Sequence, residues 1–142
     1  MTTRLVTRAA RDERGVAAVE FAIILPVLVL MLMGIIDWGF FFFFSESVVN
    51  AAREGARAGV VEPDSGDTTT TAETVAQAYL GSANIEIGTG TNEAEASADL
   101  DGSDLAVTVT MTSFEGLTGF LAPPLIPSSI TYTSTMRWEN AP

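Results

Sequence analysis

The chain has 142 residues, 47% of them hydrophobic, and its 18 acidic and 7 basic residues give a net charge of −11. This charge argues against nucleic acid as a partner, because the phosphates would repel the protein. The length allows one domain with, at most, an anchor. The chain contains neither cysteine nor histidine, so a disulfide framework and thiolate chemistry are excluded, as are the commonest general base and metal ligand.

A long apolar segment follows a basic leader at residues 1–15. No charged residue occurs from Phe21 to Ile36, Asp37 then interrupts the run, and five phenylalanines occupy positions 40–44. A helix from Phe21 to Phe44 is about 36 Å long, which is enough to cross a hydrocarbon core of about 30 Å with some tilt. We therefore predict a transmembrane helix over residues 16–44. A removable secretory signal is the alternative, although its apolar stretch would be only about 7–15 residues long.

The charges on the two sides of this segment predict its orientation. Arginines at positions 4, 8, 11 and 14 precede it, and acidic residues dominate after it. Basic residues favour the cytoplasmic side of a membrane. We therefore expect a single-pass protein of the cell (inner or plasma) membrane, with membrane lipid as a partner, a cytoplasmic N-terminus and an extracytoplasmic C-terminal domain.

Residues 45–60 are expected to continue the helix outside the membrane, because they are rich in alanine and contain no proline. In a helical projection one face is polar and includes Glu54 and Arg57, which are spaced to form an ion pair. The opposite face has small residues, which allow another backbone to approach closely: Ala52, Gly55, Ala56 and Gly59. We expect this face to pack against sister chains, and packing against the chain's own outer domain is the alternative.

A linker at residues 61–71 and a small outer domain at residues 72–142 complete the chain. Pro63 stops the long helix, and residues 72–80 predict a short helix with Gly81 as its C-cap. Apolar and polar residues then alternate as in half-buried antiparallel strands, in about four segments: 85–87, 94–100, 105–112 and 130–138. Asp101-Gly102 indicates a hairpin between the second and third of these segments.

The predicted fold class is therefore α+β. It comprises a long N-terminal transmembrane α-helix that extends outside the membrane, followed by a small antiparallel β-sheet domain with one short helix. Trp138 and Met136 are expected among the larger core residues of this domain, which is too small to bury much apolar surface.

No segment predicts an active site, and we expect a non-enzymatic protein without a metal or cofactor. The acidic sequence ADLDGSDL resembles a calcium loop only faintly, since its glycine comes too early and position twelve is Thr110. We interpret it as a hairpin turn, with weak cation binding as the alternative. The apolar sequence LTGFLAPPLIP, residues 117–127, contains three prolines and is not a central strand. It is either a loop folded over the sheet or an exposed contact surface.

The first sixty residues also resemble a known family. A glycine, four small or apolar residues and a Glu-Phe pair before an apolar helix form the pattern read by prepilin peptidases, here Gly15, residues 16–19 and Glu20-Phe21. More closely, GVAAVEFAIILPVLVLMLMGIIDWG followed by NAAREGARAG is similar to the TadE-like family of tight-adherence pilus assembly proteins. The similarity covers residues 14–59 and includes Pro26 and Asp37-Trp38-Gly39.

This resemblance implies a minor pilin-like, or pseudopilin, assembly component whose partners are sister pilus subunits and a prepilin peptidase. Cleavage after Gly15 would give Val16 a new α-ammonium group. Glu20, then the fifth residue of the mature chain, would offset this charge in its own or a neighbouring chain. The alternative is an uncleaved single-pass scaffold of the secretion machinery, with Arg11 and Arg14 within reach of Glu20. A membrane-tethered binding module or enzyme is a third hypothesis.

Overall fold

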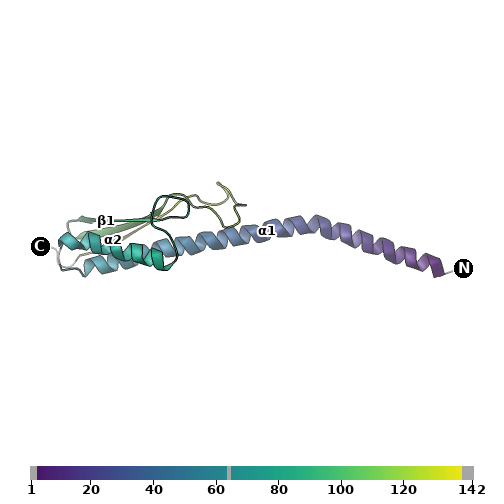
Figure 1. Cartoon of the computed structure of the whole chain (residues 1–142), viewed down its shortest axis with the longest axis horizontal. Helices are drawn as coiled ribbons and strands as arrows, with labels where there is room; N and C mark the ends of the chain where they lie inside the picture. The colour runs from purple at the N-terminus through teal and green to yellow at the C-terminus, as the bar shows by residue number, and fades with distance from the viewer. Residues whose placement is uncertain (1–2, 64, 139–142) are drawn as a thin grey trace.

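The computed structural model describes residues 3–63 and 65–138. Its elements, in chain order, are α1 (Thr3–Val60), α2 (Ser65–Ser82), β1 (Glu95–Asp101), β2 (Asp104–Met111) and β3 (Ile130–Arg137). Figure 1 shows that the N-terminal half of α1 projects alone, whereas α2 and the sheet lie along its C-terminal half. The predicted α+β class is confirmed.

α1 is one continuous helix of 58 residues. Between Gly15 and Ile36 its large apolar side chains are exposed, except for the half-buried Met33. The helix contains a window that is long and apolar enough to cross a membrane. Pro26 lacks the N–H that would bond to the carbonyl of Ala22, and Figure 1 shows α1 bending in this half. As expected, the helix ends shortly before Pro63.

α2 is longer than the sequence pattern indicated. It runs over Ser65–Ser82, so most of the linker expected at residues 61–71 is helical. The threonine-rich sequence was typical of a loop, but α2 buries one residue at each turn against the rest of the domain: Thr68, Ala72, Ala76 and Leu80. This packing supplies the stability that the intrinsic helix propensity of the sequence lacks.

The C-terminal cap of α2 also differs from the expected one. Gly81 lies inside the helix, and the residue in the left-handed conformation is Asn84, with φ of 63°. The N–H of Asn84 donates to the carbonyl of Gly81 and the N–H of Ile85 to that of Leu80, both at 3.0 Å. These two bonds define a Schellman motif, in which the hydrophobic residue after the cap contacts the last turn. Ile85 and Leu80 are accordingly both buried in the core.

β1, β2 and β3 form an antiparallel sheet with β2 in the centre. Ala98 pairs with Val107, and Val107 in turn pairs with Ser134. Gly102, with φ of 63°, lies in the two-residue turn between β1 and β2, where the Asp-Gly pair predicted a hairpin. The strand expected at residues 85–87 is wrong, because in the described part of the chain this segment makes only a single bridge, between Ile87 and Ala94.

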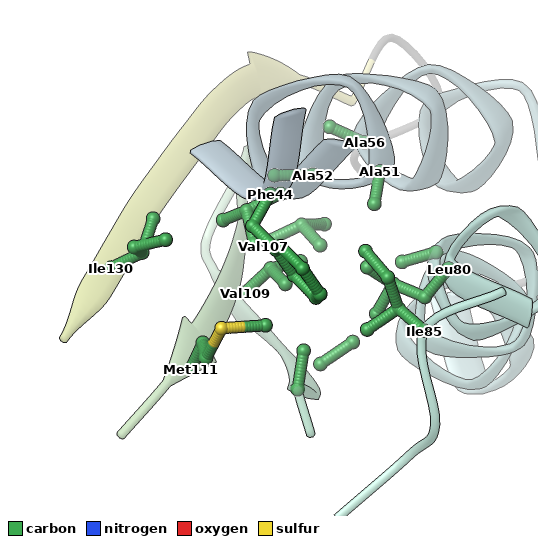
Figure 2. Close-up of a cluster of buried hydrophobic side chains, with 14 of the residues drawn as sticks. Phe44, Ala51, Ala52, Ala56, Leu80, Ile85, Val107, Val109, Met111 and Ile130 are labelled. Atoms are coloured by element: carbon green, nitrogen blue, oxygen red, sulfur yellow. The ribbon is translucent and has the colours of Figure 1, made fainter. Parts of the chain in front are cut away.

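The core lies between one face of the sheet and the two helices (Figure 2). All the inward residues of β2 are completely buried: Leu105, Val107, Val109 and Met111. Trp138 is buried as expected, and its indole Nε1–H donates to the carbonyl of Glu62 at 2.9 Å. Met136 is only partly buried. The C-terminal half of α1 is thus an integral part of the outer domain.

Candidate functional site

The expected processing residues lie at the start of the projecting half of α1. Val16 is exposed, and a side chain added at Gly15 would meet no atom within 4 Å. Glu20 is also exposed and lies four residues after Val16, so the two share one face of the helix. Arg11 and Arg14, the alternative partners of Glu20, lie outside the residues whose side chains are described. No other described part of the chain therefore covers the peptide bond between Gly15 and Val16.

The small-residue face of α1 packs inside the chain. A Cβ added at Gly55 would lie 2.6 Å from the backbone oxygen of Ala72 and 2.9 Å from Cβ of Ala76. A Cβ at Gly59 would lie 2.5 Å from Leu105 Cδ2 and 2.9 Å from Ala72 Cβ. The other two members of the face, Ala52 and Ala56, are completely buried.

Of the two alternatives for this face, the structure therefore adopts the intrachain one. The two glycines let α1 approach Ala72 and Ala76 of α2 more closely than a larger residue would permit. Because this face is occupied, it leaves no surface for a sister chain in this conformation. The expectation of intermolecular packing at these four positions is corrected accordingly.

The opposite face of this part of α1 is polar. Arg57 and Glu54 form the expected ion pair, with 3.1 Å between Nη2 and Oε1. The hydrogen bonds that the Arg57 guanidinium donates to Glu54 raise its pKa, but a solvent-exposed pair of this kind contributes little to stability. One helical turn from Arg57, the guanidinium of Arg53 lies 5.6 Å from the ring centroid of Tyr132 on β3, within cation–π range.

Asp37 is completely buried, although it interrupts the apolar run of α1. Its Oδ1 accepts the backbone N–H of Thr118 at 2.7 Å, and its Oδ2 accepts the Thr118 hydroxyl at 2.7 Å and the N–H of Leu121 at 3.1 Å. A Cβ at Gly116 would lie 2.7 Å from the Asp37 carboxyl carbon, so the loop can wrap this closely only with glycine there. We call this arrangement the Asp37 clamp.

The Asp37 clamp was not predicted, because its two halves are more than 80 residues apart in the chain. One signal in the sequence could have indicated it. An acid inside an apolar helix is costly unless it is paired or hydrogen-bonded, so Asp37 required a partner just as Glu20 did. The sequence pattern could not identify that partner, since Thr118 lies in a loop without regular periodicity.

The five phenylalanines at positions 40–44, shortly after Asp37 on α1, have two different environments. Phe40, Phe41 and Phe44 surround the ring of Phe114, with centroid distances of 6.1, 5.3 and 5.7 Å. Phe42 and Phe43 point away from the domain and are exposed. Phe44 is part of the core of the outer domain.

The two remaining segments with a possible chemical role are the acidic turn and the proline-rich loop. The turn is the β1–β2 hairpin, and the described residues contain no group of three or more acidic side chains placed to hold a metal ion. The loop at residues 117–127 has both a buried part and an exposed part. Ile126 is buried and Leu121 is partly buried, whereas Leu117, Phe120 and Leu125 are exposed.

Comparison with known families gives a match over the first helix. Residues 15–57 match the family model described as TadE-like protein. No curated protein and no solved structure matches the chain. The matched segment begins at Gly15, contains Glu20 and Asp37, and ends within the small-residue face of α1. The resemblance of this helix to the TadE-like family is therefore confirmed.

Proposed function

We propose that this chain, whose residues 15–57 are TadE-like, is a pseudopilin-like assembly component of a tight-adherence pilus. The family match associates the chain with such a pilus. The observation that carries the finer proposal is the division of α1. One uninterrupted helix presents bare apolar side chains from Val16 to Ile36 and then forms the spine of the outer domain. The proposed processing motif, Gly15 with Glu20, lies at the start of the exposed half of the helix.

In this proposal the bare half of α1 anchors the protein and packs against sister chains. The segment from Val16 to Ile36 is about 31 Å long, which matches a hydrocarbon core of about 30 Å. Its large apolar side chains are exposed in the described chain, except for the half-buried Met33. Because the small-residue face is occupied, this segment replaces residues 52–59 as the proposed contact between subunits.

Processing would license assembly through a charge pair. Cleavage after Gly15 gives Val16 an α-ammonium group, whose usual pKa of about 7.7–8.0 keeps it largely charged at neutral pH. Glu20 lies one helical turn away and can offset this charge within the chain or across to a neighbour. Pairing reduces the cost of burying both charges among apolar helices.

The first experiment tests the cleavage. Intact mass and N-terminal sequencing of the wild-type membrane protein should give a chain that begins at Val16. Gly15→Leu should retain the leader, because a bulky residue blocks entry of the bond into a peptidase site. Gly34→Leu is the matched control, since Gly34 is also helical with no atom within 4 Å of its Cβ position, and it should be processed normally. A wild-type chain that begins at Met1 would favour the uncleaved scaffold.

The second experiment separates cleavage from assembly. Glu20→Gln should still be cleaved, yet cross-linking between sister chains should be lost because the Val16 ammonium has no counter-charge. Glu46→Gln, which changes an exposed carboxylate on the outer part of the same helix, should assemble like the wild type. Unchanged cross-linking of Glu20→Gln would refute the charge-pair mechanism.

The third experiment tests the proposed orientation. The chain has no cysteine, so Asp101→Cys introduces one labelling site in the hairpin of the outer domain. A membrane-impermeant maleimide should label this variant in intact spheroplasts. Labelling only after lysis would place the outer domain on the cytoplasmic side and overturn the orientation.

A further inference from the structure

The Asp37 clamp indicates where the membrane ends. The loop at residues 116–121 lies against Asp37, and in Figure 1 this part of the chain reaches furthest toward the bare half of α1. An irregular backbone exposed to hydrocarbon would leave N–H and carbonyl groups without partners, at a cost of several kcal/mol each. With α1 inserted as proposed above, the hydrocarbon core would end before this loop, at about Ile36 rather than at Phe44.

Exposed apolar side chains occur directly after Asp37 on α1 and also in the loop that contacts Asp37. Half of them belong to the helix and half to the loop. These side chains are between 38% and 67% exposed: Trp38, Phe42, Phe43, Leu117, Phe120 and Leu125. We call this set the apolar collar.

The charge distribution around the collar fits a lipid interface. The protein carries a net charge of −11, yet no charged residue occurs between Gly116 and Met136 or between Trp38 and Ser45. Two acids lie near this level: Asp37 is buried and accepts three hydrogen bonds, whereas Glu115 is exposed, with its carboxylate 3.7 Å from the Cβ position of Gly119. Tryptophan and tyrosine are enriched where a membrane protein crosses the headgroup region, and Trp, Phe and Leu form the apolar face of segments that lie in it; the collar contains Trp38 with phenylalanines and leucines.

We propose that the apolar collar is seated in the headgroup region of the bilayer, so that the loop at residues 117–125 is a second membrane contact beside α1. The collar continues directly from the bare segment that we place in the hydrocarbon core. In this position its side chains leave water, as the apolar face of an interfacial segment does. The Asp37 clamp holds the loop at this depth and so fixes the height of the outer domain above the membrane.

The absence of cysteine makes the depth of single positions measurable. Phe120→Cys and Leu125→Cys carry a spin label on the loop, Ile24→Cys reports the hydrocarbon core, and Asp101→Cys reports water at the hairpin remote from the loop. The full chain is reconstituted in lipid nanodiscs at one chain per disc, so that no second copy can cover the collar. The measured quantity is the ratio of label collisions with oxygen, which enters lipid, to collisions with a water-soluble nickel chelate.

We expect both loop labels to show a ratio well above that at Asp101 and below that at Ile24. A ratio at both loop positions equal to that at Asp101 would overturn the proposal. A ratio that rises only when several chains share a disc would also overturn it, in favour of a second copy as the occupant. The inference depends on insertion of α1, which is part of the proposed function. A water-like ratio at Ile24 would refute that insertion, whereas a water-like ratio at the loop labels alone would leave the anchor intact.

Discussion

The Asp37 clamp allows a prediction at the level of single amide groups. In Asp37→Asn one carboxylate oxygen becomes an NH₂ group, which can only donate. If the remaining oxygen occupies the position of Oδ1, the NH₂ group occupies that of Oδ2 and faces the N–H of Leu121. If the oxygen occupies the position of Oδ2, the NH₂ group faces the N–H of Thr118. Either orientation of the amide therefore leaves one backbone N–H of the loop without its acceptor.

The size of the effect follows from that single lost bond. Leaving a fully buried donor unsatisfied costs about 1–3 kcal/mol. Because these two N–H groups make part-buried bonds, the lower end of that range applies, which is roughly 5-fold in an opening equilibrium. Hydrogen exchange at Thr118 or Leu121 should accelerate by this factor. Amides in the centre of β2 should be unchanged, because the clamp holds the loop and not the sheet.

The assay is residue-resolved hydrogen exchange of the full chain in detergent micelles or nanodiscs. Glu46→Gln is the matched control, because it makes the same carboxylate-to-amide change on the same helix, where Glu46 accepts only a local bond from Asn50 at 3.1 Å. Exchange rates at Thr118 and Leu121 that are equal in Asp37→Asn and the wild type would refute the clamp. Equal acceleration in the Glu46 control would show that the effect is not specific to Asp37.

Further variants test the packing of the outer domain. Gly55→Ala places a Cβ 2.6 Å from a backbone oxygen of α2. Overpacking costs about 1–3 kcal/mol and alanine regains about 1 kcal/mol of helix propensity, so the free energy of unfolding of the outer domain in urea should fall by up to about 2 kcal/mol. Gly81→Ala, which meets nothing within 4 Å, should not destabilise it, and equal losses would contradict tight helix contact. Trp138→Phe removes the indole hydrogen bond to Glu62 and should cost about 0.5–1.5 kcal/mol; an unchanged unfolding midpoint would contradict this role. Asn84→Val forces a β-branched residue into the left-handed region and should lower the thermal midpoint, whereas Asn84→Gly should not; equal midpoints would exclude strain at the cap.

Features that depend on neighbouring residues were predictable from the sequence. The apolar run of α1 identified a possible membrane span, and the alternation along β1, β2 and β3 identified the sheet, because each pattern follows from the period of the element itself. The proposed processing residues Gly15 and Glu20 came instead from a resemblance to the pattern read by prepilin peptidases, and their role stays a prediction; the segment that contains them matches the TadE-like family. Nothing outside α1 is needed to place them.

Only the tertiary structure decided which surfaces of α1 are available. A face of small residues such as Gly55 and Gly59 is equally suited to a sister helix or to α2, and the choice depends on how α2 and Leu105 pack around it. Likewise the sequence showed Asp37 as an interruption, and the fold supplied its partners from a loop more than 80 residues away. Contacts over such separations depend on the packing of the whole domain and leave no periodic trace in the local sequence. For this reason the length of the apolar run was determined by sequence, whereas the point at which α1 enters the outer domain was determined by the fold.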